Sequence, residues 1–354
     1  MTVGILTFHR GPNYGGYLQA WHLRQAVRSL GHQAEIINYQ NETLRRSEKP
    51  ILHNFHPATL RHAFRVWRKS KPFHTLVNSF SPDPFTSDPE QVHWNRFDTV
   101  IVGSDVVWDY QTPHFGHDPC YFAAHPSQQK TRFISYAASC GPARPESGIP
   151  DWVTRGLQRF DSIAVRDQTT RNLVHQTCNM EPTLVVDPTW LNDDPAPKRS
   201  IAPTKPYILV YGNALNATRA AELRAYARSR GLLLVGAASA WKYCDITLNG
   251  FDPFQWVALF QKAQAVVTAT LHGLLYTIKA GKPLLMVALP AAANKSRTVL
   301  ERLNAHNRII SPDQPFGPEK LKLLDPENPL APDLNWIRES REYLQNALAS
   351  PSHP

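Results

Sequence analysis

Short apolar runs alternate with helical segments along almost the whole chain, and this alternation constrains the fold more than any other feature. Each run ends abruptly in small or polar residues, which is typical of parallel strands buried on both faces. We therefore predict an α/β fold with parallel sheets. In the first half, the predicted strands cover residues 3–8, 34–39, 98–105, 132–139, 161–167 and 182–188.

A stretch rich in proline and charge, residues 192–206, interrupts the alternation, which then restarts. A chain of 354 residues is also long for one hydrophobic core. We therefore predict two α/β domains whose parallel sheets face a central cleft that holds the ligand. The predicted boundaries are an N-terminal domain over 1–195, a linker over 196–206, a C-terminal domain over 207–325, and a C-terminal helix and tail over 326–354.

The composition favours a globular chain, with 42% hydrophobic and 19% charged residues. No apolar run is long enough to cross a membrane, and the first residues lack the charged region of a signal peptide. The four cysteines lie far apart without a C-x-x-C pair, which fits reduced thiols. These features predict a cytoplasmic location.

The net charge of +9 is concentrated in one segment, because residues 44–71 carry eight Lys/Arg and one Glu. We predict a basic helical insertion over about 41–97. Leu60, Phe64 and Trp67 are spaced as on one face of a helix. This face would dock on its own domain or lie on an anionic inner membrane surface. No nucleic-acid-binding motif accompanies the charge, so we predict no nucleic acid partner.

Several motifs are absent from the sequence, and their absence excludes classes of enzyme. No G-x-G-x-x-G follows a strand, and no G-x-x-x-x-G-K-[ST] is present. The sequence also lacks a D-x-D pair that would hold a metal on a sugar diphosphate. The two H-x-x-H pairs, at 53–56 and 114–117, lie in loop-like stretches flanked by proline, so we predict no metal site.

The loop GPNYGG, residues 11–16, follows the first strand and opens a helix. Its backbone N–H groups around Asn13, Tyr14 and Gly15 could approach an anion or a hydroxyl closely. A plain tight turn is the alternative.

Two more predicted strands end in residues that could carry chemistry. Gly103, Ser104 and Asp105 follow one of them, where Asp105 could accept a proton from a sugar hydroxyl or merely cap a helix. Arg166 follows another and could bind a carboxylate or a phosphate through two hydrogen bonds. A structural ion pair with Asp167 or another acid is the alternative for Arg166.

The sequence TATLHGLLYTIKAGKP, residues 268–283, places His272 where a strand turns into a helix. A protonated imidazole is disfavoured near a helix N-terminus unless an anion lies beside it. An anionic ligand would therefore make His272 a usable general acid. A buried neutral histidine bonded to the backbone is the alternative.

These segments together resemble the polysaccharide pyruvyl transferase family. The matching pieces follow the family's order over about residues 3–310: GILTFHRGPNYGGYLQAWHL, LGHQAEIINY, FDTVIVGSDVVW, ISYAAS, AVRD, VVDPTWL and TLHGLLYTIKAGKP. The resemblance implies a GT-B-like fold of two Rossmann-like domains. It also implies transfer of pyruvate from phosphoenolpyruvate to two hydroxyls of one sugar, as a ketal, in bacterial exopolysaccharide biosynthesis. The acceptor would be a polysaccharide or its lipid-linked precursor, and no metal or redox cofactor is required.

The resemblance also implies roles for individual residues. The arginine of the family's V-R-[DE] segment and the histidine of its [RS]-[LF]-H-G segment correspond to Arg166 and His272. His272 would protonate C3 of the donor or the leaving phosphate, and Arg166 would hold the donor's carboxylate or phosphate. The acceptor side would be lined by Asn13, Tyr14, Ser104 and Asp105, with Asp105 as the base.

One departure from the family concerns Thr270, which stands where some members carry an arginine. Lys295 or Arg297, close to Asn294 at the expected start of the next helix, would supply the missing cation. The remaining predicted substrate-binding residues lie in both halves of the chain. They are Gly15 and Gly103 in the loops of the first half, and Thr270, Gly273, Asn294 and Lys295 in the second half.

Two other functions fit the same features. A GT-B glycosyltransferase that uses a nucleotide sugar would employ the same type of cleft, and His272 could bind its diphosphate. A non-catalytic component of polysaccharide assembly would bind glycan, with the basic segment on the membrane.

Overall fold

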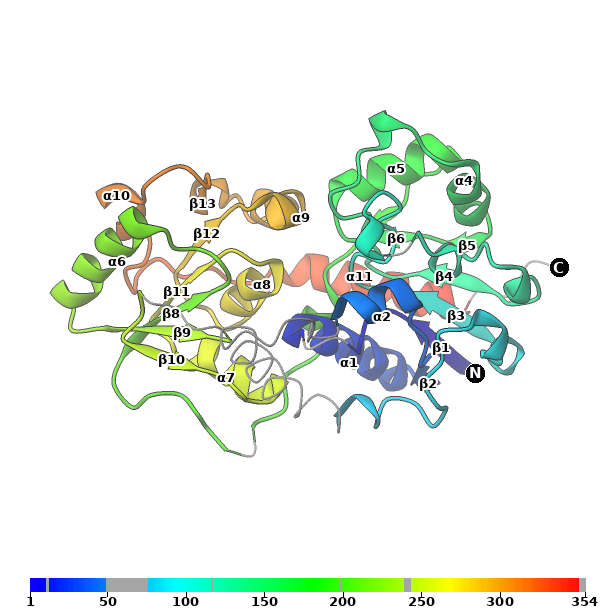
Figure 1. The fold of residues 1–354 in the computed structure, drawn as a ribbon, viewed down its shortest axis with the longest axis horizontal. Coiled ribbons are helices and arrows are strands. Elements are labelled where there is room, and N and C mark those ends of the chain that lie inside the picture. The colour runs from blue at the N-terminus through cyan, green and yellow to red at the C-terminus, as the bar shows by residue number, and fades with distance from the viewer. Residues whose placement is uncertain (11–12, 49–75, 116, 198, 239–242, 350–354) are drawn as a thin grey trace, which may run out of the picture. The chain divides into compact units, whose positions relative to one another are not determined.

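The computed structural model describes residues 1–10, 13–48, 76–115, 117–197, 199–238 and 243–349. They form two compact units (Figure 1). Unit 1 contains the described residues up to Asn192 and from Leu334 onward, and unit 2 contains those from Asp193 to Asp333.

The division differs from the predicted boundaries at two places. Unit 2 begins at Asp193 rather than after a linker at 196–206. Within unit 2, the Asp194 carboxylate lies 2.7 Å from Lys279 Nζ, and this ion pair ties the start of the predicted linker to the unit. The C-terminal helix, predicted as a separate segment from residue 326, belongs to unit 1.

The main sheet of unit 1 has five parallel strands in the order β2-β1-β3-β4-β5. β1 lies between β2 and β3, so the loops that follow β1 and β3 leave neighbouring strands at the point where the strand order reverses. In α/β folds this switch point is where ligands bind. The bounds are β1 (Thr2–Leu6), β2 (Gln33–Ile36), β3 (Thr99–Val102), β4 (Phe133–Ser135) and β5 (Phe160–Ser162).

The strand predicted over 161–167 is two strands. β5 ends at Ser162, and β6 (Ala164–Val165) pairs in parallel with β7 (Thr183–Leu184) in a separate small sheet. The hydroxyl of Ser135 bonds both the N–H and the carbonyl of Ala164 at 3.0 Å, so a side chain replaces the backbone ladder there. Single bridges join Asp105 to Ala138 and Ala138 to Val165, which keeps the strand ends side by side.

The described residues of unit 1 also form helices and short 3₁₀ turns, most of which connect these strands. Asn13 caps the first helix, which ends before Gly31, where φ is +86°. The helices are α1 (Tyr14–Ser29), α2 (Glu42–Glu48), α4 (Asp151–Leu157), α5 (Gln168–Cys178) and α11 (Leu334–Ala349). The 3₁₀ turns are η1 (Pro89–Gln91), η2 (Trp94–Arg96), η3 (Pro113–Phe115), η4 (Pro119–Phe122), η5 (Pro126–Gln128), η6 (Pro145–Ser147) and η7 (Pro188–Trp190).

Several side-chain hydrogen bonds attach α11 to the rest of unit 1, and three of them come from residues on one face of the helix. Trp336 Nε1 donates to the carbonyl of Leu184 at 2.9 Å. Ser340 Oγ accepts from the N–H of Val186 at 3.0 Å, and Tyr343 OH donates to the carbonyl of Ser135 at 3.0 Å. The spacing of these residues places them on one face of the helix.

Unit 2 contains six parallel strands in the order β10-β9-β8-β11-β12-β13, so its switch point lies between β8 and β11. The strands are β8 (Tyr207–Tyr211), β9 (Leu233–Ala237), β10 (Ile246–Leu248), β11 (Ala265–Thr268), β12 (Leu284–Val287) and β13 (Ile309–Ile310). The two edge strands, β10 and β13, were not predicted, because runs of three and two residues carry no periodic signal.

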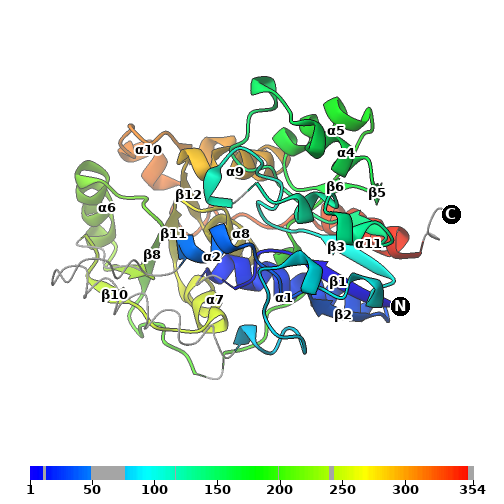
Figure 2. The same ribbon diagram turned by 45° about the vertical axis from the view of Figure 1, so that its right-hand side comes forward.

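The helices of unit 2 cover both faces of this sheet. α6 and α10 lie on one side of the strands, and α7 and α8 lie on the other (Figures 1 and 2). The helical elements are α6 (Ala217–Ser229), α7 (Pro253–Lys262), α8 (Leu271–Lys279), α9 (Pro290–Arg302), α10 (Gly317–Lys322) and the 3₁₀ turn η8 (His306–Arg308).

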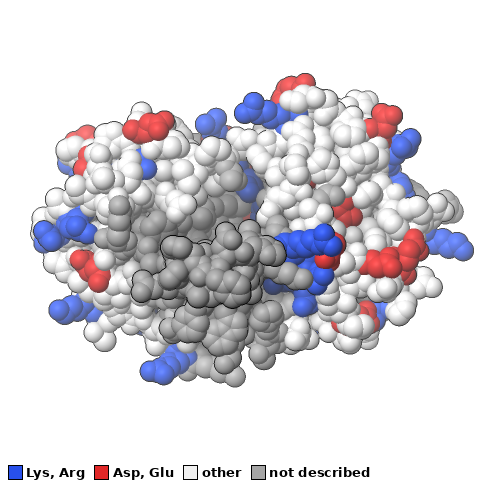
Figure 3. Space-filling view, in the orientation of Figure 1, with Lys and Arg blue, Asp and Glu red and all other residues white. Residues whose placement is uncertain are grey.

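Most of the predicted basic segment, and with it the predicted apolar face of Leu60, Phe64 and Trp67, lies outside the described residues. Its first turns belong to α2, where Arg45 and Arg46 both pair with Glu42. On the face drawn in Figure 3, basic and acidic side chains are otherwise interspersed over each unit. No helix in the described ranges is long and apolar enough to span a membrane.

The first prediction concerns the attachment of α11. In Ser340→Ala the buried N–H of Val186 loses its acceptor, so the free energy of unfolding should fall by about 1–3 kcal/mol. Urea unfolding measures this change. Glu342→Ala, at an exposed position on the same helix, should change the value by less than about 0.5 kcal/mol. Equal effects of the two substitutions would contradict the attachment.

The second prediction concerns His9, which follows β1 and is 3% exposed. Its Nδ1 lies 3.0 Å from the carbonyl of Thr7, but burial outweighs this bond and lowers the pKa of His9 to about 4. Between pH 6.5 and pH 4 the unfolded chain therefore binds a proton that the folded chain does not. The free energy of unfolding should fall as the pH is lowered through this window, with roughly 3 kcal/mol from His9.

In His9→Asn this fall should be smaller by about 2–3 kcal/mol, as measured by urea unfolding at pH 7 and pH 4.5. The exposed His306, changed to Asn, serves as the control and should leave the fall unchanged. A fall in His9→Asn identical to that of the unsubstituted chain would show that His9 is protonated in the folded state.

Candidate active site

The loop after β1 places the predicted residues of GPNYGG at the start of α1. Asn13 is exposed and caps the helix, since its Oδ1 accepts from the N–H of Gly16 at 3.3 Å. Tyr14 and Gly15 are buried, Tyr14 completely. Of these three predicted residues, only Asn13 presents its side chain at the surface of unit 1.

The loop after β3 is shaped by Gly103, whose φ is +115°. A Cβ at this position would lie 2.3 Å from the carbonyl oxygen of Tyr136, so only glycine fits. Ser104 is fully buried, and its Oγ accepts from the N–H of Asp105 at 2.6 Å. Asp105 also has a positive φ, +77°, and is 9% exposed.

Two residues that the sequence did not single out join these loops. Thr7 Oγ1 donates to the carbonyl of Ser104 at 2.8 Å and accepts from Gln19 Nε2 at 2.9 Å. Gln19 also donates to the carbonyls of Phe8 and Gly16. The sequence did carry a signal for Gln19, since it stands among the apolar residues of YLQAW. A buried amide needs hydrogen-bond partners, so such a glutamine is expected to bond neighbouring loops.

Arg166, directly after β6, is only 2% exposed. Its Nη1 donates to Asp187 Oδ2 at 2.7 Å and to Ser104 Oγ at 3.4 Å, and its Nη2 lies 3.5 Å from Asp105 Oδ1. Burial disfavours the charged form, but the carboxylates of Asp187 and Asp105 outweigh burial and raise the pKa of Arg166 above its ordinary value. Within the described part of the chain, Nε and Nη2 have no hydrogen-bond partner.

Asp187 is therefore the main ion-pair partner of Arg166, and the sequence did not identify it. Its other oxygen, Oδ1, accepts from the N–H and the hydroxyl of Thr189 at 3.1 and 2.8 Å. Asp167, the acid suggested by sequence proximity, caps α5 by accepting from the N–H of Thr170 at 2.9 Å. The signal for Asp187 was its place in VVDPTW, where it follows an apolar run.

Asp105 is the acid at this switch point that is open to a ligand. Its Oδ1 accepts from the N–H of Val106 at 2.9 Å and faces Arg166. Its Oδ2 makes no hydrogen bond with the residues that the structure describes, and its side chain is 13% exposed. Unit 1 therefore presents one carboxylate oxygen, supported by a buried cation, at the carboxyl ends of its strands.

In unit 2, His272 follows β11 and lies in the first turn of α8. Thr270 caps this helix, since its Oγ1 accepts from the N–H of Gly273 at 3.1 Å. A Cβ on Gly273 would lie 2.1 Å from Thr268 Oγ1, so the turn requires glycine. The side chain of His272 is partly exposed, at the helix end that favours anions.

The helix expected to begin near Asn294 begins at Pro290, because proline suits the first helical position. Asn294, Lys295 and Arg297 therefore lie beyond the first turn of α9 rather than at its start. Asn294 and Arg297 are exposed, and Lys295 is partly buried. α9 packs against α8, which carries His272.

The predicted residues thus form two groups, one at each switch point. The group in unit 1 offers a carboxylate that could accept a proton from a hydroxyl. The group in unit 2 offers an imidazole at a helix N-terminus, which could donate a proton to an anionic ligand. Each group lies where open α/β sheets bind ligands.

Solved structures with similar folds cover nearly the whole chain. The UDP-GlcNAc 2-epimerase of Methanocaldococcus jannaschii, in complex with UDP-GlcNAc and UDP, matches with a TM-score of 0.54 and 14% identity over 97% of this chain and 99% of that chain. The MnaA–UDP structure from S. aureus matches with a TM-score of 0.50 and 12% identity over 98% and 96%. At this identity the likeness shows the fold alone, and it confirms the predicted GT-B-like pair of α/β domains.

The comparison with curated proteins gave no match. The family model for polysaccharide pyruvyl transferase matches residues 13–289, which span both switch points and the segments around Arg166 and His272. The chain belongs to the polysaccharide pyruvyl transferase family.

Proposed function

We propose that this protein transfers pyruvate from phosphoenolpyruvate to two hydroxyls of one sugar, in a polysaccharide or its lipid-linked precursor. The observation that carries the proposal is the position of His272 in the first turn of α8, directly after the strand at the switch point of unit 2. A proton donor beside a site for anions is what a phosphorylated enol requires.

The reaction balances without a metal or redox cofactor. A proton added to C3 of phosphoenolpyruvate makes C2 electrophilic, and the first sugar hydroxyl adds to C2 and loses its proton. The C2–O bond to phosphate breaks and inorganic phosphate leaves. The second hydroxyl then adds to C2 and loses its proton, which closes the ketal.

His272 is proposed as the acid for C3 or for the leaving phosphate. The helix N-terminus that carries it would stabilise the donor's negative charges. Thr270, which caps this helix, and Gly273, which lets the turn close, would position the imidazole. Lys295 or Arg297 of the neighbouring α9 would supply a cation for the donor.

Asp105 is proposed as the base that accepts a proton from the acceptor hydroxyl, through its open Oδ2. Arg166 would hold the Asp105 carboxylate in place, because its Nη2 lies 3.5 Å from Oδ1 and its Nη1 is anchored by Asp187. Arg166 would also bind the donor's carboxylate or phosphate directly, through Nε and Nη2, which make no hydrogen bond with the described residues.

The proposed setting is the cytoplasm, with the basic segment at the inner face of an anionic membrane where lipid-linked sugars are found. The charge of residues 44–71 supports this placement. Binding of the purified chain to anionic liposomes, and its loss when Arg61, Arg65, Arg68 and Lys69 are all changed to Gln, would support the membrane contact.

The third prediction concerns the donor. Phosphoenolpyruvate should raise the thermal unfolding midpoint of the protein, since a ligand at about 100 times its Kd adds about 2.7 kcal/mol to the free energy of unfolding. His272→Ala should weaken this stabilisation and reduce the release of phosphate in the presence of acceptor at least 100-fold. His306→Gln, at an exposed position of unit 2, is the matched control and should change neither value.

UDP-GlcNAc and UDP, the ligands named for the epimerase structure, form the competing arm of this experiment. Stabilisation by a nucleotide sugar and none by phosphoenolpyruvate would refute pyruvyl transfer and favour the glycosyltransferase alternative. Full retention of turnover in His272→Ala would refute the role of the histidine.

The fourth prediction concerns the acceptor side. Asp105→Asn keeps the shape of the side chain but removes the base, so kcat should fall by about 10²–10⁴-fold while stabilisation by phosphoenolpyruvate is retained. Asp88→Asn is the matched control, because Asp88 is an exposed cap of η1 and asparagine caps equally well. An unchanged kcat in Asp105→Asn would exclude this aspartate as the base.

A further inference from the structure

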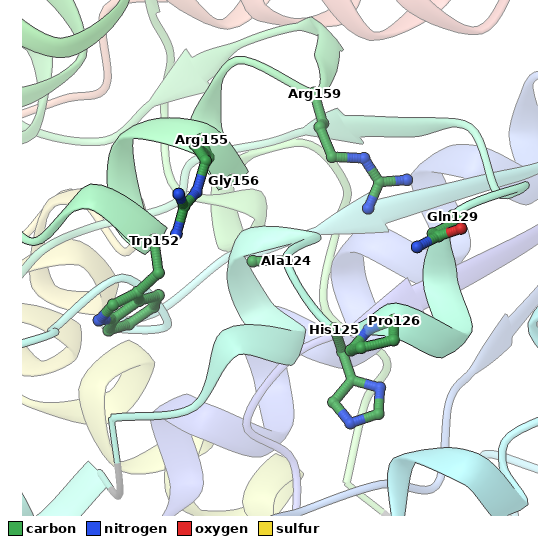
Figure 4. Close-up of a pocket in the computed structure, with 8 residues that line it drawn as sticks. All are labelled: Ala124, His125, Pro126, Gln129, Trp152, Arg155, Gly156 and Arg159. Atoms are coloured by element: carbon green, nitrogen blue, oxygen red, sulfur yellow. The ribbon is translucent and has the colours of Figure 1, made fainter.

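Unit 1 contains a cavity of about 280 Å³ that is separate from the switch point (Figure 4). Residues 124–129, which line one side, precede β4, and residues 152–159, which line the other, precede β5. The cavity therefore lies towards the amino ends of these strands. The loops that carry Asp105 and Arg166 follow the carboxyl ends of parallel strands, at the opposite edge of the sheet.

α4 shapes one wall of this cavity. Trp152, Arg155 and Gly156 are spaced to lie on one face of the helix, and Figure 4 shows Trp152 and Arg155 on the same side of the pocket. Trp152 makes a T-shaped contact with Phe122, with ring centroids 5.1 Å apart, which holds the indole in place. Gly156 lets α4 approach the backbone of Phe122 closely, because a Cβ there would lie 2.3 Å from the carbonyl oxygen of Phe122.

The cavity is positively charged. Arg155 is exposed and makes no ion pair or hydrogen bond with the residues that the structure describes. Arg159 donates to the carbonyls of Ala123 and Gln128, and burial, with no carboxylate to offset it, lowers the pKa of its guanidinium. No Asp or Glu is among the described residues that line the cavity.

The opposite wall supplies further polar groups. His125 Nδ1 lies 2.8 Å from Ser127 Oγ, which fixes the ring, and the exposed Gln129 carries an amide. In Figure 4 both residues lie on the other side of Ala124 from Trp152 and Arg155. Amide and imidazole groups can both donate and accept hydrogen bonds, as hydroxyl groups require.

We propose that this cavity binds an acidic saccharide, a sugar ring that bears a carboxylate. The indole of Trp152 offers an apolar surface for the ring, Gln129 and His125 offer partners for its hydroxyls, and Arg155 pairs with the carboxylate. The volume is at the lower end of ligand pockets, which suits one sugar ring better than a nucleotide. Membership of a family that acts on polysaccharides supplies the class of ligand.

The carboxylate could come from a uronic acid or from a pyruvate ketal. In either case the cavity would hold a saccharide chain at a point distant from the residues proposed for chemistry. This site goes beyond the proposed reaction, since binding there requires neither phosphoenolpyruvate nor His272.

The fifth prediction tests this site by titration calorimetry on the full chain. The probes are a methyl glucuronide, a methyl galactoside carrying a 4,6-pyruvate ketal, the neutral methyl galactoside and UMP. At least one acidic glycoside should bind at least 10-fold more tightly than the neutral one and than UMP. Binding of the ketal alone would identify the product sugar as the ligand, and binding of the glucuronide alone would identify a uronic acid.

Trp152→Ala and Arg155→Gln should each weaken acidic binding at least 10-fold. Arg228→Gln removes the same charge from an exposed position on α6 and should not. Asp105→Asn should retain binding, which separates this cavity from the site of the reaction. Arg155→Gln is a surface change that leaves the fold intact, and Trp152→Phe keeps an aromatic ring if the alanine variant unfolds.

Three results would overturn the proposal. They are equal affinity for the neutral and acidic glycosides, preference for UMP, and unchanged affinity in both Arg155→Gln and the folded Trp152 variant. Absence of binding by either acidic glycoside would also overturn it, whatever the outcome for phosphoenolpyruvate.

Discussion

The buried charge of Arg166 is the constraint around which the strand ends of unit 1 are arranged. A guanidinium that is 2% exposed has lost nearly all its water, so the protein must supply its partners. Those partners come from two other loops, Asp187 after β7 and Ser104 with Asp105 after β3. Removing one partner of such a pair costs about 3–5 kcal/mol, so the positions of these loops depend on one another. The geometry of Asp105 is therefore set by a residue that hardly touches solvent.

Parallel pairing produces the same arrangement in both units. All strands of a parallel sheet end at one edge, and reversal of the strand order leaves two neighbouring loops that diverge. In unit 1 these loops follow β1 and β3, and in unit 2 they follow β8 and β11. In unit 2 a glycine allows the two loops to approach each other. Gly212, after β8, has a φ of +76°, and a Cβ added there would lie 2.8 Å from Thr270 Cγ2. The backbone thus approaches the cap of α8 closely enough to fix the turn that carries His272.

The sequence predicted the elements whose apolar pattern is long, and the C-terminal helix predicted within 326–354 is α11, Leu334–Ala349. It also placed Asp105, Arg166 and His272 close to the carboxyl ends of strands, although it ran the strands of Asp105 and Arg166 too far. It could not identify Asp187 as the partner of Arg166, because that contact joins residues that are 21 positions apart in different loops. It also placed the start of α9 too late, at Asn294, because PAAAN has no polar cap before its proline. The division at Asp193 and the return of α11 to unit 1 depend on side-chain contacts that no local pattern shows.

The carboxyl ends and the amino ends of the strands in the unit 1 sheet carry different chemical groups. At the carboxyl edge, Arg166 is neutralised by buried carboxylates, so the open group is the negative Asp105. At the amino ends of the strands, Arg155 and Arg159 have no carboxylate partner among the described residues, which favours the proposed binding of an anion there. A neutral hydroxyl is the group that a carboxylate base needs to deprotonate, whereas an acidic sugar would be repelled by Asp105 and held by the arginines. If the reaction adds a carboxylate to each sugar that it modifies, the product would bind less well beside Asp105 than the substrate does. The same product would bind better in the cavity that contains Arg155 and Arg159.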